Sequence, residues 1–383
     1  MGQPPPDHRH LGPVQFDVSG YAGVSYDDNI NGSQYAPESD IISRLGVNVN
    51  LDWQATANSE LQLGTGIGYL DYQTYTANNG LEVSPNSALT YAVSLDDVIL
   101  TLFDQLSYSK EVRTQAALAN VTTLPQLDNN VGARVEWDPG HWTFLASYSH
   151  DNDVSTHAND YLNRASEYLY ARAGWRFAEA TQAGLEASDA LTRYQTFSLN
   201  NNQNLSIGGY VNWKVLPSLT FTLRGGPAFY EPESGSIAGN AAQNTYYFNL
   251  EANQQITSYL SHRLSVQRSL QAGINLGTGY EQELDVNYSI SWALTQWITV
   301  GVQASYVDGQ QSLGLPNNLV SSPQISVLQN ENYAQYGGGL QASWQCTQHL
   351  SANLGFNHWQ RESNLADRSY SDNSVYFQLN YTF

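Results

Sequence analysis

The side chains that could carry nucleophilic or metal chemistry include eight histidines and one cysteine, and their spacing supports neither chemistry. His150 precedes Asp151 at the polar end of a predicted strand, and His157 lies close to Asp160 just beyond it. No Gly-x-Ser-x-Gly, Walker or His-Glu-x-x-His motif accompanies these residues. Because Cys346 is the only cysteine, it cannot form an internal disulfide or a cysteine-based zinc site. The sequence therefore predicts no enzyme, no catalytic residue and no cofactor, and it assigns no function to Cys346.

Two short runs of oxygen-bearing side chains have the ligand type that Ca²⁺ prefers. They are Asp27-Asp28-Asn29 and Asp151-Asn152-Asp153. Neither run is followed by the glycine and the terminal glutamate of an EF-hand loop, so hydrated turns are the better interpretation. We therefore expect no metal site.

Charged side chains that alternate with apolar ones are the more informative feature. The set comprises Arg134, Arg172, Arg176, Lys214, Arg224, Glu136, Glu186 and Glu251. A guanidinium group presents a rigid fork of donors to carboxylates or sugar hydroxyls, so the five cations together could contact an anionic or hydroxyl-rich solute. The competing interpretation is an ordinary polar lining in which Glu136 and Glu186 neutralise nearby arginines. The sequence leaves both interpretations open.

The alternation itself predicts the elements that carry these charges. From Leu45 to Trp53 every second residue is apolar, and the residues between them are polar or glycine. Successive side chains of a strand point to opposite faces, so this pattern predicts a strand with one apolar and one polar face. Comparable segments recur at 14–26, 40–53, 60–73, 87–96, 98–109, 127–138, 141–151, 164–177, 180–193, 204–214, 218–230, 245–256, 260–271, 281–293, 297–307, 331–345, 349–360 and 371–383.

Strands of about ten residues joined in order by alternating short and long connections are typical of an up-and-down transmembrane β-barrel. The long polar connections fall at 27–39, 74–86, 110–126, 152–163, 231–244 and 308–330. We predict an all-β antiparallel barrel of about 18 strands over residues 14–383, with 16 as the alternative count, preceded by a flexible periplasmic tail in residues 1–13. Charge on a lipid-facing surface is costly, so the charged set is expected to line the pore.

The composition excludes several other classes. Only 13% of the residues are charged and the formal net charge is -20, which argues against nucleic acid as a partner because phosphate binding needs a basic surface. The 26 tyrosines and the low charge density argue against disorder. The scarcity of lysine argues against a helical bundle.

Tryptophans mark one level of the predicted barrel. Those near the short connections include Trp53, Trp137, Trp175, Trp213, Trp292 and Trp344. An indole prefers the headgroup region of a bilayer, so we expect these side chains to form a membrane girdle at the short-turn end.

The two ends of the barrel sequence resemble known outer-membrane proteins. The alternating apolar residues Phe377, Leu379, Tyr381 and Phe383 resemble the assembly signal of Gram-negative outer-membrane barrels. This likeness implies a bacterial outer-membrane location and recognition by the barrel assembly machinery. The segment 20–30 is similar to the opening strand of the β-barrel porin-2 family, which partly overlaps barrels encoded with exopolysaccharide export systems. The resemblance implies an outer-membrane pore, suggests a glycan cargo and transfers no catalytic residue.

Three functions fit this barrel. The first is a pore for hydrophilic solutes that exports an exopolysaccharide, with outer-membrane lipid, lipopolysaccharide and a periplasmic polysaccharide-export protein as partners. The alternative is a general or cation-preferring diffusion porin, for which residues 308–330 are the candidate constricting loop. The third is a structural or receptor barrel whose lumen is closed.

Overall fold

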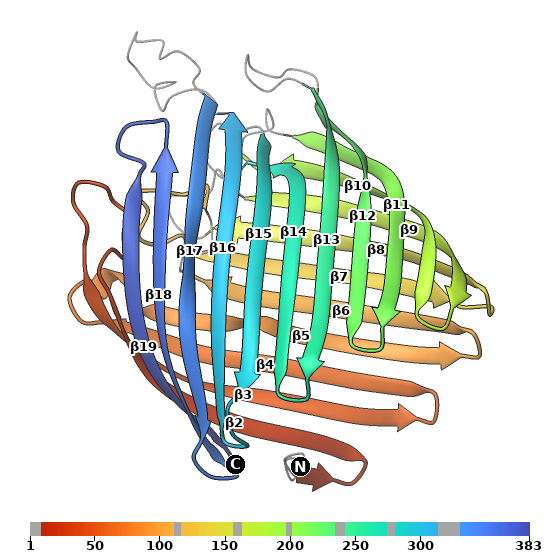
Figure 1. The fold of residues 1–383 in the computed structure, drawn as a ribbon, viewed down its shortest axis with the longest axis horizontal. Coiled ribbons are helices and arrows are strands. Elements are labelled where there is room, and N and C mark those ends of the chain that lie inside the picture. The colour runs from red at the N-terminus through yellow and green to blue at the C-terminus, as the bar shows by residue number, and fades with distance from the viewer. Residues whose placement is uncertain are drawn as a thin grey trace.

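The computed structural model describes residues 9–110, 116–155, 163–196, 201–233, 242–273, 280–312 and 330–383. Consecutive strands pair antiparallel, and β19 returns to pair with β2, so β2 to β19 form a closed ring (Figure 1). The predicted fold class and the count of 18 strands are confirmed.

The ring consists of β2 (Val14–Asp27), β3 (Asp40–Thr56), β4 (Ser59–Tyr72), β5 (Gly80–Leu95), β6 (Val98–Ser109), β7 (Gln126–Trp137), β8 (Trp142–Ser155), β9 (Arg164–Ala178), β10 (Thr181–Tyr194), β11 (Asn202–Leu216), β12 (Leu219–Pro232), β13 (Gln243–Thr257), β14 (Leu260–Ala272), β15 (Tyr280–Ala293), β16 (Ile298–Ser312), β17 (Asn330–Gln345), β18 (Leu350–Ser363) and β19 (Tyr370–Thr382).

Several strand ends differ from the sequence-based expectation: β8 and β16 continue to Ser155 and Ser312, past the predicted ends at 151 and 307. Strand β5 begins at Gly80 rather than at 87, because the pairing with β6 continues through an irregularity between Val83 and Ser87. A further short strand, β1 (Arg9–Leu11), folds back on the first residues of β2 as a hairpin.

Helix is almost absent from the described part of the chain. The described residues contain one 3₁₀ turn, η1 (Thr76–Asn78), and no helix that is long and apolar enough to cross a membrane.

The outer face of the ring is apolar because every strand turns its alternating aliphatic and aromatic residues outward. Leu45 is 66% exposed, Leu185 72% and Leu340 57%. A soluble protein rarely exposes so continuous an apolar surface, whereas a transmembrane barrel presents it to lipid. The polar residues between them face the interior, so the sequence pattern determines which face is wet.

Tyrosines on the inner face lie against glycines of the adjacent strand or of the next strand but one. A Cβ atom on Gly46 would lie 2.3 Å from the ring of Tyr21, and one on Gly174 would lie 2.0 Å from the hydroxyl of Tyr210. A side chain at either glycine would displace the ring into the lumen. The abundance of tyrosine and glycine therefore has a packing reason: the rings cover the inner wall without filling the pore.

The two ends of the barrel differ in the length of their connections. The short turns gather at one end, together with β1 and the end of β19, and the described long connections, such as 28–39, lie at the other (Figure 1). At the short-turn end most of the predicted girdle indoles project outward: Trp53, Trp137, Trp213, Trp292 and Trp344 are all exposed, and the less exposed Trp175 packs edge-on against Trp142 with ring centroids 4.8 Å apart. Contact between these indoles and lipid headgroups stays a prediction.

Candidate functional site: a constricted lumen

A segment of the β6–β7 connection, residues 116–125, crosses the lumen. The side chains of Ala116 and Ala117 are buried, and they pack with Tyr333 of β17 and Val307 of β16 on the inner wall. Strands β7 and β16 are nine positions apart in the ring, so this segment reaches the opposite wall. The described part of this connection therefore narrows the pore from within.

Hydrogen bonds hold the crossing segment in place. Arg361 of β18 donates from Nε to the carbonyl oxygen of Ala116 at 2.7 Å. The carbonyl oxygen of Ala117 accepts from Arg368 Nη2 at 2.8 Å and from Gln311 Nε2 at 3.2 Å. We call these three donors and two carbonyl groups the latch. Because the donors are fixed on the opposite wall, the latch ties the crossing segment to that wall.

A buried carboxylate organises the latch. Glu331 is 0% exposed, and its Oε1 lies 2.8 Å from Arg361 Nη2 and 2.8 Å from Arg368 Nε. The hydroxyl of Ser363 donates to the same oxygen at 2.7 Å. Buried charges persist when they are paired and hydrogen-bonded, and here one carboxylate orients both arginines toward the loop.

An acidic cavity lies beside the crossing segment at the loop end of the lumen. It has a volume of about 400 Å³, and Ala116 and Ala117 form part of its wall. Of the described residues that line it, five are acidic and only Arg164 is basic. The acidic residues are Asp151 and Asp153 of β8 and Glu281, Glu283 and Asp285 of β15.

The two acidic groups approach from walls seven strands apart. Arg164 pairs with Asp153, and the hydroxyl of Tyr333 donates to Glu281 and, at 2.6 Å, to Glu283. One guanidinium cannot balance five carboxyl groups, so the constriction has an excess of acidic groups. A permeating cation would meet oxygen ligands on both sides of its path.

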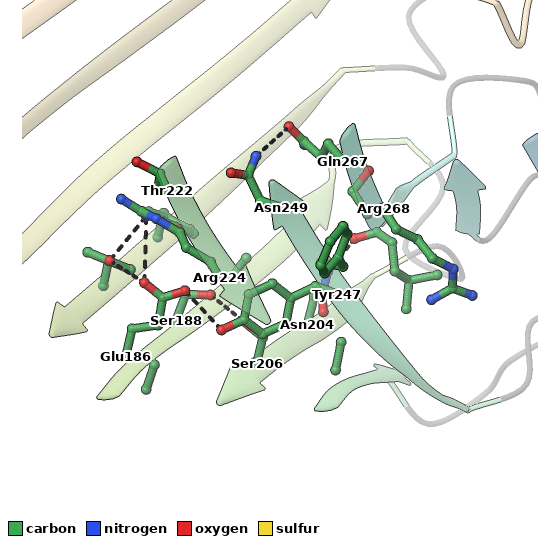
Figure 2. Close-up of a pocket in the computed structure, with 18 of the residues that line it drawn as sticks. Glu186, Ser188, Asn204, Ser206, Thr222, Arg224, Tyr247, Asn249, Gln267 and Arg268 are labelled. Atoms are coloured by element: carbon green, nitrogen blue, oxygen red, sulfur yellow. Dashed lines mark hydrogen bonds and ion pairs between the residues drawn. The ribbon is translucent and has the colours of Figure 1, made fainter. Parts of the chain in front are cut away.

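A wider cavity continues along the lumen from the constriction. It has a volume of about 690 Å³ and lies on the wall from β9 to β14, and both cavities are lined by Ala190, Asn204 and Leu270. Its lining residue Glu186 accepts hydrogen bonds from the hydroxyl of Tyr170 at 2.8 Å and from that of Tyr247 at 2.9 Å (Figure 2). The lumen thus holds a smaller acidic cavity beside the crossing segment and a larger cavity next to it, the wide cavity.

The sequence-predicted charged residues separate into several places. Arg224 and Glu186 meet at 3.6 Å in the wide cavity, and Glu251 lines the same cavity while pairing with Arg263 at 3.1 Å. Arg134 pairs with Glu136 on its own strand at 2.9 Å. These contacts agree with the interpretation of a polar lining with acid partners, and pore lining by the whole set stays a prediction.

Of the other basic residues, Arg172 lies in register with Glu186 on the neighbouring strand, whereas Arg176 and Lys214 lie nearer the short-turn end. The guanidinium of Arg172 lies 5.5 Å from the ring centroid of Tyr210. Arg176 pairs with Asp138 and donates to the carbonyl oxygen of Gly140 at 3.2 Å, which holds it against the β7–β8 turn. Lys214 is exposed two residues before the end of β11. Three of the five cations, Arg134, Arg176 and Arg224, are thus each paired with a carboxylate.

Sequence reasoning missed the latch and expected a different constricting loop. Most of the expected segment, 308–330, lies outside the described residues, whereas the described residues 116–125 occupy the lumen. The available signal was alternation: Glu331 and Arg361 have inward parity on β17 and β18. Nothing in the local sequence of 116–125 identifies partners more than 190 residues away.

The two oxygen-rich runs have structural partners, and the expected turn at Asp151-Asn152-Asp153 is wrong because this run lies inside β8, paired with β7 and β9. Asp28 accepts hydrogen bonds from the backbone and side-chain amides of Asn373, at 2.7 and 2.8 Å, where β2 meets β19. Carboxylate oxygens of Asp27, Asp28 and Asp372 lie within 4.8 Å of one another. Of the histidine sites considered from the sequence, His150 bonds to Glu167 at 2.9 Å, while His157 and Asp160 lie outside the described residues. The contacts at Asp28 join the first and last strands of the ring.

No protein-family model matches the chain, and no curated protein matches it. Solved structures do match its fold. A BenF-like porin from Pseudomonas fluorescens Pf-5 aligns with a TM-score of 0.53 at 10% identity over 97% of this chain and 100% of that one. Pseudomonas aeruginosa OccK2 (OpdF) gives 0.52 at 10% identity over 97% of each chain.

Pseudomonas aeruginosa OpdK, solved with vanillate, gives a TM-score of 0.51 at 10% identity over 96% of this chain and 99% of that one. At this identity the similarity concerns the fold. The resemblance to the β-barrel porin-2 family is thus supported at the level of a porin-type barrel. With its closed 18-stranded antiparallel ring and apolar outer face, the chain has the β-barrel fold of porins.

Proposed function

We propose that the chain is a passive diffusion pore for small hydrophilic solutes and that it prefers cations. The observation that carries this proposal is the latched segment 116–125, which narrows the lumen beside five acidic residues. A ring of like charge at a constriction sets the sign of the ions that pass. The formal net charge of -20 adds a long-range attraction for cations at the pore mouths, which salt would screen.

The latch favours diffusion over export of a long polysaccharide. A polymer needs a continuous wide passage, whereas the crossing segment is tied to the opposite wall by hydrogen bonds from three side chains. The acidic residues at the same level would also repel an anionic polymer. Both polar cavities of the lumen favour an open pore over a closed barrel.

Swelling of proteoliposomes in isosmotic solutes separates these functions. A diffusion pore should admit arabinose and the cationic amino acid lysine readily, and it should exclude dextran. Swelling by dextran would favour a wide export conduit. Absence of swelling with every small solute, from protein that migrates as a heat-modifiable folded barrel, would contradict the pore function.

A further inference from the structure

The wide cavity between β9 and β14 differs from the constriction in the balance of its acidic and basic side chains. Its described lining carries the charged residues Glu186, Glu251, Arg224 and Arg268, and the guanidinium of Arg268 turns away to lie 3.9 Å from the ring centroid of Tyr246 (Figure 2). Arg224 pairs with Glu186 at 3.6 Å, and Arg263 pairs with Glu251 at 3.1 Å. Because these charges are balanced within the wall, the cavity offers neither sign of ion a strong preference.

The rest of the polar lining consists of amides and hydroxyls. These groups are Ser188, Asn204, Ser206, Asn212, Thr222, Asn249 and Gln267. Asn249 donates to Gln267 at 3.5 Å across neighbouring strands, and Ser188 and Ser206 are linked at 2.7 Å (Figure 2). An amide has two donor hydrogens and an acceptor oxygen, so each amide retains capacity beyond this one contact. A ligand that both donates and accepts hydrogen bonds would match this wall.

An aromatic ring adds an apolar surface to the same cavity. A Cβ atom on Gly208 would lie 2.2 Å from the hydroxyl of Tyr247, so only glycine lets this side chain lie against the wall. The hydrogen bond from Tyr247 to Glu186 fixes the ring's outer end (Figure 2). The negative face of such a ring attracts the weakly positive C–H groups of a solute.

We propose that this cavity is a binding subsite for a small, uncharged, hydroxyl-rich solute, such as a mono- or disaccharide. Three properties converge on this class: balanced charge, a dense set of groups that donate and accept, and a fixed ring for C–H contacts. The volume of about 690 Å³ falls in the range of small-molecule sites, roughly 300–1,000 Å³. The inference rests on the proposed pore function, because the solute must enter through the lumen.

Block of the ion current by maltose in planar bilayers tests this subsite. Maltose should reduce the KCl current through the wild-type channel at millimolar concentration, beyond its effect on bulk conductivity. Replacement Tyr247→Ala should raise the half-blocking concentration about fivefold, as expected for loss of one aromatic contact. The double replacement Asn249→Ala/Gln267→Ala should raise it further. The conductance in KCl alone checks that each variant is assembled.

The matched control is Tyr376→Ala. Tyr376 is also an inward tyrosine that lies over a glycine, Gly355, but it is outside the described lining of this cavity. Its replacement should leave the half-blocking concentration unchanged. A conducting wild type that maltose does not block, or equal weakening by Tyr247→Ala and Tyr376→Ala, would overturn the subsite and leave the pore function standing. A wild type that conducts no ions would overturn both.

Discussion

Replacement of Arg361 by alanine should loosen the crossing segment and widen the pore. Arg361 is 0% exposed, and it supplies the bond to Ala116, one of the three donor contacts of the latch. A hydrogen bond from a charged donor contributes about 1.5–3 kcal/mol, so the latch should lose about 2 kcal/mol. The ratio of latched to released states should then fall about 30-fold, since 1.4 kcal/mol corresponds to a factor of about ten. Arg368 continues to neutralise Glu331 in this variant, which limits damage to the fold.

Single-channel recording measures this effect. The Arg361→Ala channel should show a larger mean conductance and more frequent transitions between conductance levels than the wild type. Arg193→Ala is the control, because Arg193 is exposed at the loop end of β10 and lies 3.9 Å from Glu233, far from the latch in the ring. Wild-type conductance and noise in a folded Arg361→Ala channel would refute the assignment of the latch.

Three further predictions concern assembly, the basic residues and the lipid face. Deletion of Phe383, whose backbone amide bonds to the first strand of the ring, should reduce the yield of heat-modifiable inserted barrel, and unchanged yield would refute its part in assembly. Replacement Arg172→Glu should shift ion preference toward cations more than Arg176→Glu, because the β7–β8 turn already neutralises Arg176; an equal shift in reversal potential would contradict this. Replacement Val47→Arg, deeper in the apolar band, should lower the free energy of unfolding from bilayers by about 2–4 kcal/mol, while Trp53→Arg at the girdle should lower it by about 1 kcal/mol or less. Denaturant titration in lipid vesicles measures the free energy of unfolding of both variants. Equal losses of free energy would contradict the deeper position assigned to Val47 in the bilayer.

Much of the fold could be predicted because one physical rule applies to every strand. A strand that faces lipid on one side and water on the other must alternate, and a shift by one residue exchanges the faces. This rule predicted that Glu186 and Arg224 share the inner face, and the structure brings them to 3.6 Å. Alternation alone could not predict that the two side chains form an ion pair, because they belong to strands β10 and β12, which are not adjacent in the ring.

The strand ends show where local patterns stop being informative. The run Ser84-Pro85-Asn86 has the composition of a turn, yet β5 continues through it as an irregular stretch. Pairing with β4 and β6 on either side outweighs the local preference. The same limit applies to Arg176, whose parity points inward although its guanidinium is engaged by a turn.

The constriction was the least predictable part of the site. The segment 116–125 has small and polar residues without a strand pattern, and its position depends on donors from β16 and β18 and from the β18–β19 connection. Such contacts form only when the whole ring closes, so the residue types next to 116–125 in the sequence do not predict them. The acidic cavity beside it is likewise assembled from β8 and β15, which only the closed barrel brings face to face.

The reversal potential of the wild-type channel in a KCl gradient tests the central claim most directly. The acidic constriction predicts a reversal potential with the sign expected for K⁺ permeation. The triple replacement Glu281→Gln/Glu283→Gln/Asp285→Asn removes three of the five acidic groups, so the reversal potential should move toward zero. High salt should reduce the preference of the wild type, since mobile ions screen the lining. A wild-type potential of the sign set by Cl⁻, or a folded barrel that carries no current, would contradict the account.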